Sequence, residues 1–256
     1  MHRLTSLNSI LEVLKSSPLS VNKIFIQKDK SHKKIKEIIK YAKIHSIPVV
    51  LVPKKRLDRE TKEHQGIIAL LSPKEFSSLE EVLCESICPF LLILDGIEDP
   101  RNFGAIIRTA EGAGVNGIII PERRSVGLTE TVFHTSAGAL AHVKIVRVKN
   151  IARLIDELKE KGLWIIGAEA ESNEYWYEFD YTLPVALVFG SEGKGLRHLV
   201  KEKCDKILSI PLFGKINSLN VSVAVSIFLY EVVKQRNLKF QDSKVKNNKV
   251  IKNKNE

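Results

Sequence analysis

Several features that mark other classes of protein are scarce or missing in this sequence. It has no run of 18 or more apolar residues, so a membrane-spanning helix of ordinary length is not expected. Asn8 and Glu12 interrupt the apolar part of the amino-terminal stretch, which argues against a secretory signal. There are only three cysteines in 256 residues. We therefore expect no disulfide framework, and a reducing cytoplasmic setting is favoured.

The common catalytic and ligand-binding motifs are missing as well. Neither a G-x-G-x-x-G fingerprint nor a Walker loop occurs, and no Ser/His/Asp order or carboxylate pair can be identified. Cys84 and Cys88 have the spacing of one helix face, but no further Cys or His completes a set of metal ligands nearby. A bound metal is therefore not predicted.

Positive charge is concentrated at the two ends of the chain. Counting Lys and Arg against Asp and Glu, residues 1–73 carry a net charge of +9 and residues 74–240 a net charge of −2, out of +10 in total. The last residues, 241–256, carry +3. This distribution favours a polyanion such as RNA as the partner of the first segment over a merely soluble, lysine-rich surface.

The first 73 residues alternate helical and extended patterns. Apolar residues at helical spacing and short apolar runs predict helices at 7–14 and 35–42 and strands at 21–26, 49–52 and 66–71. We therefore expect a small α/β domain over residues 1–73. A linker over residues 74–89 follows, because prolines, serines and acidic residues gather there.

From Phe90 onward the alternation becomes longer. Continuous apolar strands separated by helices predict a parallel sheet covered on both faces, over residues 90–240. A basic, disordered tail is expected over residues 241–256, where lysine and asparagine occur without periodicity. The expected strands are 91–94, 117–120, 143–148, 163–167, 185–189 and 207–210, and the expected helices are 104–113, 129–139, 151–161, 196–202 and 219–236.

Polar loops follow three strands of this predicted sheet, at the edge where open α/β sheets bind ligands. In the first loop Pro100 fixes a turn, and Asn102 lies close to the expected start of a helix at Gly104. Arg108 then lies one turn into that helix. The alternative is that Asn102 caps the helix and Arg108 extends to solvent.

The second loop, residues 189–196, is rich in glycine. Gly190, Gly193 and Gly195 flank Glu192 and allow the backbone to approach a ligand closely. On its own this loop could equally be a structural turn between a strand and a helix. It is no Walker loop, because the Lys-Ser/Thr ending is missing.

The third loop, residues 210–220, opens a helix that is apolar on nearly every face. Asn217, Ser218 and Asn220 stand at the mouth of that helix. Such side chains either cap the free N–H groups of the helix, for which Ser218 is a candidate, or face a ligand. Three polar loops leaving one sheet together indicate a binding site.

In their order and spacing these three segments resemble the three motifs of the SpoU family of RNA ribose 2′-O-methyltransferases, within the SPOUT class. Residues 95–114 resemble the first motif, 188–196 the second and 210–225 the third. The basic first domain ends in residues 64–69, with the sequence HQGIIA. It resembles the L30e-like substrate-binding domain of the bacterial subgroup that methylates a guanosine of large-subunit ribosomal RNA.

The resemblance implies a fold and a cofactor beyond what the residue patterns give. The expected architecture is α/β, with a small L30e-like domain and a parallel-sheet SPOUT domain whose carboxyl-terminal part forms a trefoil knot. The family implies S-adenosyl-L-methionine as cofactor, with contacts at Gly190, Ile210 and Leu219. It also implies a homodimer in which both subunits contribute to each site.

The same resemblance assigns Asn102, Arg108, Glu192, Ser218 and Asn220 to the catalytic face. In the family the arginine of the first motif is implicated in activating the ribose hydroxyl. A guanidinium is almost never deprotonated in proteins. Arg108 is therefore expected either to be the base or to orient an RNA phosphate that helps to accept the proton.

The function implied is S-adenosylmethionine-dependent 2′-O-methylation of ribosomal RNA, at a guanosine of the large subunit. One alternative is transfer RNA as the substrate, although the simplest transfer-RNA members of the family have no separate amino-terminal domain. A second alternative is a non-catalytic RNA-binding protein on the same scaffold. The full set of polar residues in the three loops argues against this alternative, because a protein without catalytic activity would not need it.

Overall fold

The computed structural model describes residues 2–16, 18–28, 30, 32–72 and 74–252 of the chain. Contacts divide the chain into two compact units. The first comprises Met1–Ser77, Glu98–Glu111 and Val126–Lys144, and the second Ser78–Ile97, Gly112–Ser125 and Ile145–Glu256. No helix in the described part of the chain combines the length and the apolar character that crossing a membrane requires.

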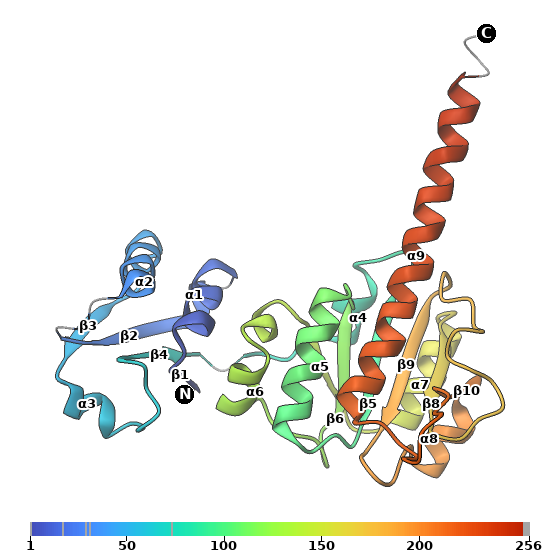
Figure 1. The fold of residues 1–256 in the computed structure, drawn as a ribbon, viewed down its shortest axis with the longest axis horizontal. Helices are drawn as coiled ribbons and strands as arrows, with labels where there is room; N and C mark the ends of the chain where they lie inside the picture. Colours follow the sequence, from blue (N-terminus) through green and yellow to red (C-terminus); the bar gives the residue numbers. More distant parts are fainter. Residues whose placement is uncertain (1, 17, 29, 31, 73, 253–256) are drawn as a thin grey trace. The chain divides into compact units, whose positions relative to one another are not determined.

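The first unit contains a four-stranded mixed sheet in the order β1-β4-β2-β3 (Figure 1). Its strands are β1 (His2–Leu4), β2 (Val21–Gln27), β3 (Val49–Val52) and β4 (Ile67–Leu71), and its helices α1 (Leu7–Ser16), α2 (Lys33–Ile44) and α3 (Lys54–Asp58). Helices α1 and α2 pack against each other, and α2 buries Ile35, Ile38 and Ala42 on one face. These apolar residues have the helical spacing from which the helix at 35–42 was predicted.

The same unit includes α5 (Pro100–Gly112), α6 (Glu130–Thr135) and the short helix η2 (Ala139–Ala141). Gly104 of α5 lies so close to α6 that an added Cβ would stand 1.8 Å from Thr135 Oγ1. Gly138, just before η2, lies against the Glu12 side chain of α1. The Lys74 ammonium donates to the Ala141 carbonyl at 3.3 Å. These contacts join α5 and α6 to the amino-terminal sheet in one unit.

The second unit contains a six-stranded sheet in the order β10-β8-β9-β5-β6-β7, and every neighbouring pair is parallel. Its strands are β5 (Phe90–Asp95), β6 (Gly117–Pro121), β7 (Ile145–Val148), β8 (Trp164–Ala168), β9 (Val185–Gly190) and β10 (Lys206–Leu208). The central strands β5 and β9 are buried along their whole length. These strands are apolar at every position because both faces of the sheet are covered by other elements.

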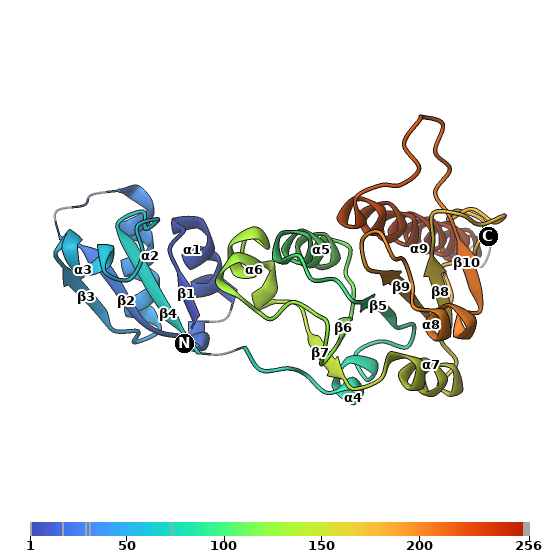
Figure 2. The same cartoon turned by 90° about the horizontal axis from the view of Figure 1, so that it is seen from below.

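Helices cover both faces of this sheet (Figure 2). Helices α4 (Leu79–Leu83), α7 (Ile151–Glu160) and α8 (His198–Lys203) contribute to one apolar cluster with the strands. Helix α9 (Val221–Lys252) packs on the opposite face, where the rings of Phe228 and Phe189 meet edge to face at 5.3 Å. The α/β architecture with a parallel sheet is confirmed.

Several expected boundaries differ from the structure. Helix α5 begins at Pro100 rather than at Gly104, because proline fits the first turn of a helix, where its missing N–H is not needed. The helix expected over 129–139 is interrupted after Thr135, where Ala137 and Gly138 adopt positive φ values of 51° and 96°. Helix α9 continues to Lys252 although disorder was expected from Gln241, and no proline or glycine breaks this segment. Residues 253–256 lie outside the described residues, and the trefoil knot stays a prediction.

Candidate active site

A cavity of about 840 Å³ lies beyond the carboxyl ends of β8 and β9, within the second unit. Its walls come from residues 168–171, from 189–195 and from the segment between β10 and the first turns of α9. The volume falls within the usual range for small-molecule sites. The sequence-predicted residues of the second and third loops all line it: Gly190, Glu192, Ile210, Ser218, Leu219 and Asn220.

The glycine-rich loop closes on itself where it borders the cavity. The Ser191 N–H donates to the Gly195 carbonyl at 3.1 Å, and the Gly195 N–H donates back to the Ser191 carbonyl at 2.9 Å. Gly193 and Gly195 have φ values of 78° and 65°, a region that favours glycine. An added Cβ at Gly190 would stand 2.0 Å from the carbonyl carbon of Gly195, so only glycine fits there. The loop therefore exposes the side chain of Glu192 at its tip.

The third loop leads into α9 with exposed polar side chains. The Asn220 Oδ1 accepts a hydrogen bond from the Ser222 N–H at 2.9 Å and another from the Ser222 hydroxyl at 2.5 Å. The Asn220 carbonyl accepts from the N–H groups of Val223 and Ala224. Asn220, rather than Ser218, therefore caps this helix. Ser218 is exposed and lines the cavity.

The two predicted residues of the first loop, Asn102 and Arg108, lie on α5 in the other compact unit. The Asp99 carboxylate accepts from the Arg101 N–H at 2.7 Å, so Asp99, not Asn102, provides the cap. The sequence placed Arg108 one turn into the helix. Because the helix starts at Pro100, Arg108 lies in its third turn instead. Arg108 is exposed, and Asn102 is half-buried.

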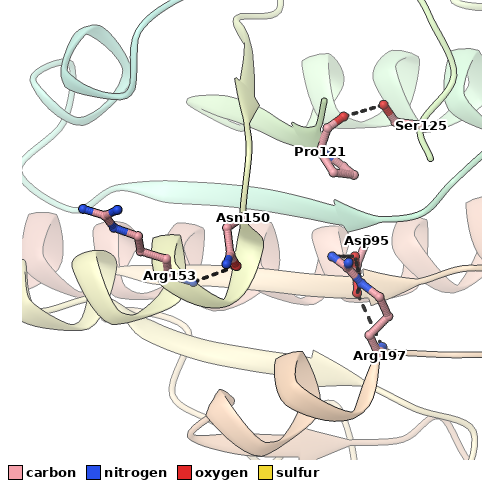
Figure 3. Close-up of polar contacts among 6 residues, drawn as sticks. All are labelled: Asp95, Pro121, Ser125, Asn150, Arg153 and Arg197. Carbon is pink, nitrogen blue, oxygen red and sulfur yellow. Dashed lines mark hydrogen bonds and ion pairs between the residues drawn. The ribbon is translucent and has the colours of Figure 1, made fainter. Parts of the chain in front are cut away.

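An ion pair between a buried carboxylate and an exposed arginine, which the sequence did not suggest, lies at the end of β5. The Asp95 carboxylate is 2% exposed and accepts from the Arg197 Nε at 2.8 and 2.9 Å, with a further contact to a terminal guanidinium nitrogen at 2.5 Å. Figure 3 shows the two side chains facing one another between the end of β5 and the start of α8. The hydrogen bond from Arg197 to Asp95 raises the pKa of the guanidinium, which therefore stays charged.

Several charged residues that line the cavity were not singled out from the sequence. Glu169, immediately after β8, and Lys201, on α8, line the cavity and approach each other to 3.6 Å. Glu171 and Lys194 complete the charged lining together with Glu192. The position of Glu169 in the sequence could have identified it as a site residue. It directly follows a buried parallel strand, as do the three polar loops.

Among the residues that the structure describes, histidines and cysteines do not gather into a site of this kind. Within the described parts of the chain, no group of three or more His, Cys, Asp or Glu side chains could hold a metal ion. His64 is held by its own turn: its Nδ1 accepts from the Gly66 N–H at 3.0 Å, and its Nε2 lies 2.9 Å from Asp58. Both ring nitrogens of His64 are therefore engaged in local contacts.

Family models match both parts of the chain. The SpoU rRNA methylase family matches residues 89–230, and a family described as RNA 2′-O ribose methyltransferase substrate binding matches residues 7–77. Together they cover most of the described structure.

Individual relatives agree with these matches. YacO of Bacillus subtilis, named for the TrmH family of tRNA/rRNA methyltransferases, is 42% identical over 90% of this chain and 94% of its own. A relative of the same description in Staphylococcus aureus strain MSSA476 is 45% identical over 84% of this chain and 89% of its own.

Among solved structures, the SpoU methyltransferase AviRb of Streptomyces viridochromogenes, in complex with AdoMet, shares the fold. Its TM-score is 0.78 at 22% identity, over 91% of this chain and 90% of its own. The TrmH/SpoU tRNA modifying enzyme of A. aeolicus has a TM-score of 0.55 at 33% identity, over 64% and 84%. The chain belongs to the SpoU family of RNA methyltransferases.

Proposed function

We propose that this chain transfers a methyl group from S-adenosylmethionine to a ribose 2′-hydroxyl of ribosomal RNA, at a guanosine of the large subunit. The observation that carries the proposal is the shared cavity. Residues from the glycine-rich loop and from the segment before α9, about 20 to 30 positions apart, line one space of small-molecule size. Family membership supplies the reaction class, and the cavity supplies the place for the methyl donor.

The residues around the cavity suit a nucleoside with an amino-acid arm. Phe189, Leu219 and Phe228 offer apolar surface to a base. The absence of a side chain at Gly190 lets the Gly195 backbone pack against it, which keeps the glycine-rich loop in place at the cavity wall. The carboxylates of Glu171 and Glu192 and the ammonium group of Lys194 also line the cavity and can bind polar groups of the cofactor. We propose that Gly190, Ile210 and Leu219 contact the cofactor, mainly through their backbones.

S-adenosylmethionine supplies a methyl group bound to a sulfonium. The bond from the ribose O2′ to the methyl carbon forms as the carbon–sulfur bond breaks, the thioether is released, and the O2′ proton is lost. The protein must hold O2′ in line at about 3–3.5 Å from the methyl carbon, and such positioning can supply much of the rate enhancement. We propose that Asn102, Glu192, Ser218 and Asn220 hold the ribose and its neighbours in register.

Arg108 has a different part in this proposal. An arginine side chain offers N–H donors and no acceptor, so Arg108 is a poor acceptor for the O2′ proton. A planar cation with several donors is well suited to a phosphate. We therefore propose that Arg108 orients an RNA phosphate next to the reacting ribose, and that this phosphate assists in taking up the proton.

The amino-terminal domain, residues 1–73, is proposed to gather the RNA. On α2 the exposed residues Lys33, Lys36, Lys40 and Lys43 recur at intervals of three and four, so they lie along one side of the helix, and the apolar residues lie on the other. Such a lysine row can follow a phosphate backbone. The separate domain favours ribosomal over transfer RNA, although relatives of both descriptions match the chain.

We also propose that the chain acts as a homodimer in the cytoplasm. Apolar side chains are exposed on the third loop and on α9, namely Phe213, Ile216, Val223 and Tyr230. Phe213 is 97% exposed, which is unusual for a phenylalanine. Burial against a second copy would remove this surface from water. Light scattering coupled to size-exclusion chromatography should give twice the mass of the chain, 28.8 kDa.

Labelled S-adenosylmethionine tests the proposal when it is incubated with unmodified ribosomal RNA and with transfer RNA in the same tube. We expect label on ribosomal RNA, and resistance of one phosphodiester to alkaline hydrolysis, which marks a 2′-O-methyl group. Label on transfer RNA alone would favour the second substrate. Label on a base would refute ribose chemistry. Absence of both transfer and cofactor binding would favour a non-catalytic RNA-binding protein.

A further inference from the structure

The glycine-rich loop is closed by hydrogen bonds between Ser191 and Gly195, but these bonds lie within the loop and do not attach it to the neighbouring strands. It leaves β9, the strand between β8 and β5 in the sheet. Glu192, Gly193 and Lys194 at its tip are exposed, and Gly193 and Gly195 adopt conformations that glycine enters freely. Its position next to the cavity must therefore be fixed by the residues on either side of it.

One fixed point comes from the end of β8. The Glu169 Oε1 accepts a hydrogen bond from the Leu196 N–H at 2.8 Å. The same oxygen would stand 2.8 Å from a Cβ added at Gly195, so the carboxylate lies directly against the loop. The Oε2 approaches the Lys201 ammonium at 3.6 Å, and only 18% of the Glu169 side chain is exposed.

The second fixed point comes from the end of β5, on the other side of β9. The Asp95 Oδ2 is 3.4 Å from the Arg197 N–H, and both carboxylate oxygens accept from the Arg197 Nε. Arg197 is the cap residue of α8, and its own side chain makes no capping bond. Two successive N–H groups, of Leu196 and Arg197, are therefore held by carboxylates from the two strands that flank β9.

Charge at these two positions needs an explanation. Burying a carboxylate is costly unless it is paired, and apolar side chains of similar size often stabilise a fold equally well. A charged hydrogen bond, however, specifies one geometry more narrowly than apolar contact does. The arrangement fixes the exit of the loop, and therefore the place of Glu192 at the cavity.

We propose that Glu169 and Asp95 are positioning residues, which hold Leu196 and Arg197 so that the glycine-rich loop stands ready for the methyl donor. This inference rests on the proposed function, because its consequence is measured with S-adenosylmethionine. We call the carboxylates of Glu169 and Asp95 the loop clasp.

The test compares Glu169→Ala with Glu169→Gln. Glutamine keeps an oxygen that can accept from the Leu196 N–H, whereas alanine removes it. We expect the alanine variant to weaken S-adenosylmethionine binding about tenfold or more, as small misplacements can do, and glutamine to restore binding to within about threefold. Asp156→Asn is the matched control, since Asp156 pairs with Lys203 on the exposed side of α7 and does not line the cavity.

Amide hydrogen exchange of the cofactor-free protein measures the clasp independently of binding. Exchange at Leu196 should quicken in Glu169→Ala, and exchange at Arg197 in Asp95→Ala, because alanine removes the accepting oxygen in each case, while the strands keep their protection. Faster exchange with unchanged cofactor affinity would refute the positioning role and leave the proposed function standing. Unchanged exchange in both variants would refute the clasp itself. Failure of the wild-type protein to bind S-adenosylmethionine would instead refute the proposed function, and with it the role given to the clasp.

Discussion

Gly190 and Gly195 touch through their backbones: a Cβ added at Gly190 would stand 2.0 Å from the Gly195 carbonyl carbon and 2.1 Å from its oxygen. Real Cβ atoms do not come so close to a backbone, and no flexible side chain is available to move away. The end of β9 and the exit of the loop are therefore joined at this one place. The cavity wall depends on the absence of a side chain at Gly190.

Replacing Gly190 by alanine should consequently damage both stability and binding. Forced overpacking of this kind costs about 1–3 kcal/mol in the free energy of unfolding, and the displaced loop should lose affinity for S-adenosylmethionine. Urea unfolding and calorimetry measure the two effects. Gly214→Ala is the control, because an added Cβ there meets nothing within 4 Å and its φ is not positive. Equal behaviour of the two variants would contradict the close contact.

Arg108→Ala should abolish methyl transfer while leaving cofactor affinity within a few-fold. The side chain is exposed on α5 and does not line the cavity, so its removal should not disturb the cofactor. Single-turnover methylation and calorimetry on the same preparation separate the two effects. An alanine variant that turns over normally would show that Arg108 has no part in the reaction. Arg108→Lys, which keeps the charge but not the planar fork, should recover only part of the rate.

The lysine row on α2 should determine how RNA binding depends on salt. Removing one lysine that neutralises a phosphate reduces the steepness of log affinity against log salt by about 0.7–0.9. The double variant Lys36→Gln/Lys40→Gln should therefore weaken RNA binding and reduce the slope of log affinity against log salt by about 1.4–1.8. A filter-binding series between low and high salt measures this. Lys206→Gln, which removes a lysine paired with Glu174 in the second unit, should leave the slope unchanged.

Cys204 should resist alkylation. Desolvation by burial, more than any neighbouring charge, raises the pKa of its thiol to about 12. At pH 8 only about one molecule in ten thousand would carry the reactive thiolate. Cys84 is exposed and should be modified first by iodoacetamide. Peptide mass mapping over time distinguishes the two sites, and rapid labelling of Cys204 in the folded protein would contradict its burial.

Lys74 should make stability depend on pH in the alkaline range. Burial lowers the pKa of its ammonium from 10.5 to about 8. Between these values the unfolded chain binds the proton and the folded chain does not, so stability should rise as pH increases from 8 to 10.5. Lys74→Met should lose this rise. Urea unfolding of both proteins at pH 7.5 and pH 10 measures the difference, and parallel changes in the two would contradict the prediction.

Local periodicity was enough to predict most of the second unit. The helix expected over 151–161 is found at Ile151–Glu160, and the strand expected over 185–189 at Val185–Gly190. The helix carries an apolar stripe at helical spacing, and the strand is an unbroken apolar run. The strand His2–Leu4 was missed, because three residues show no alternation and it exists only through antiparallel pairing with β4. Helix α3 was missed for a similar reason, since its KKRLD sequence is mostly charged.

The candidate site was predictable only where its residues lie together in the sequence. The second and third loops carried recognisable groups of glycine, asparagine and serine, and the structure brings these to one cavity. Asp95 and Arg197, 102 positions apart, gave no local signal of their ion pair. Glu169 and Leu196 are likewise joined only by the order of the strands. Contacts of this kind depend on the topology of the sheet.

A crystal structure of the protein with S-adenosylmethionine gives the most direct test of where the methyl donor binds. We expect its density between the backbone of Gly190, the Ile210–Leu219 segment and Glu169, with the methyl group toward Glu192. Density for the ligand at any other place, with this space filled by solvent, would contradict the account.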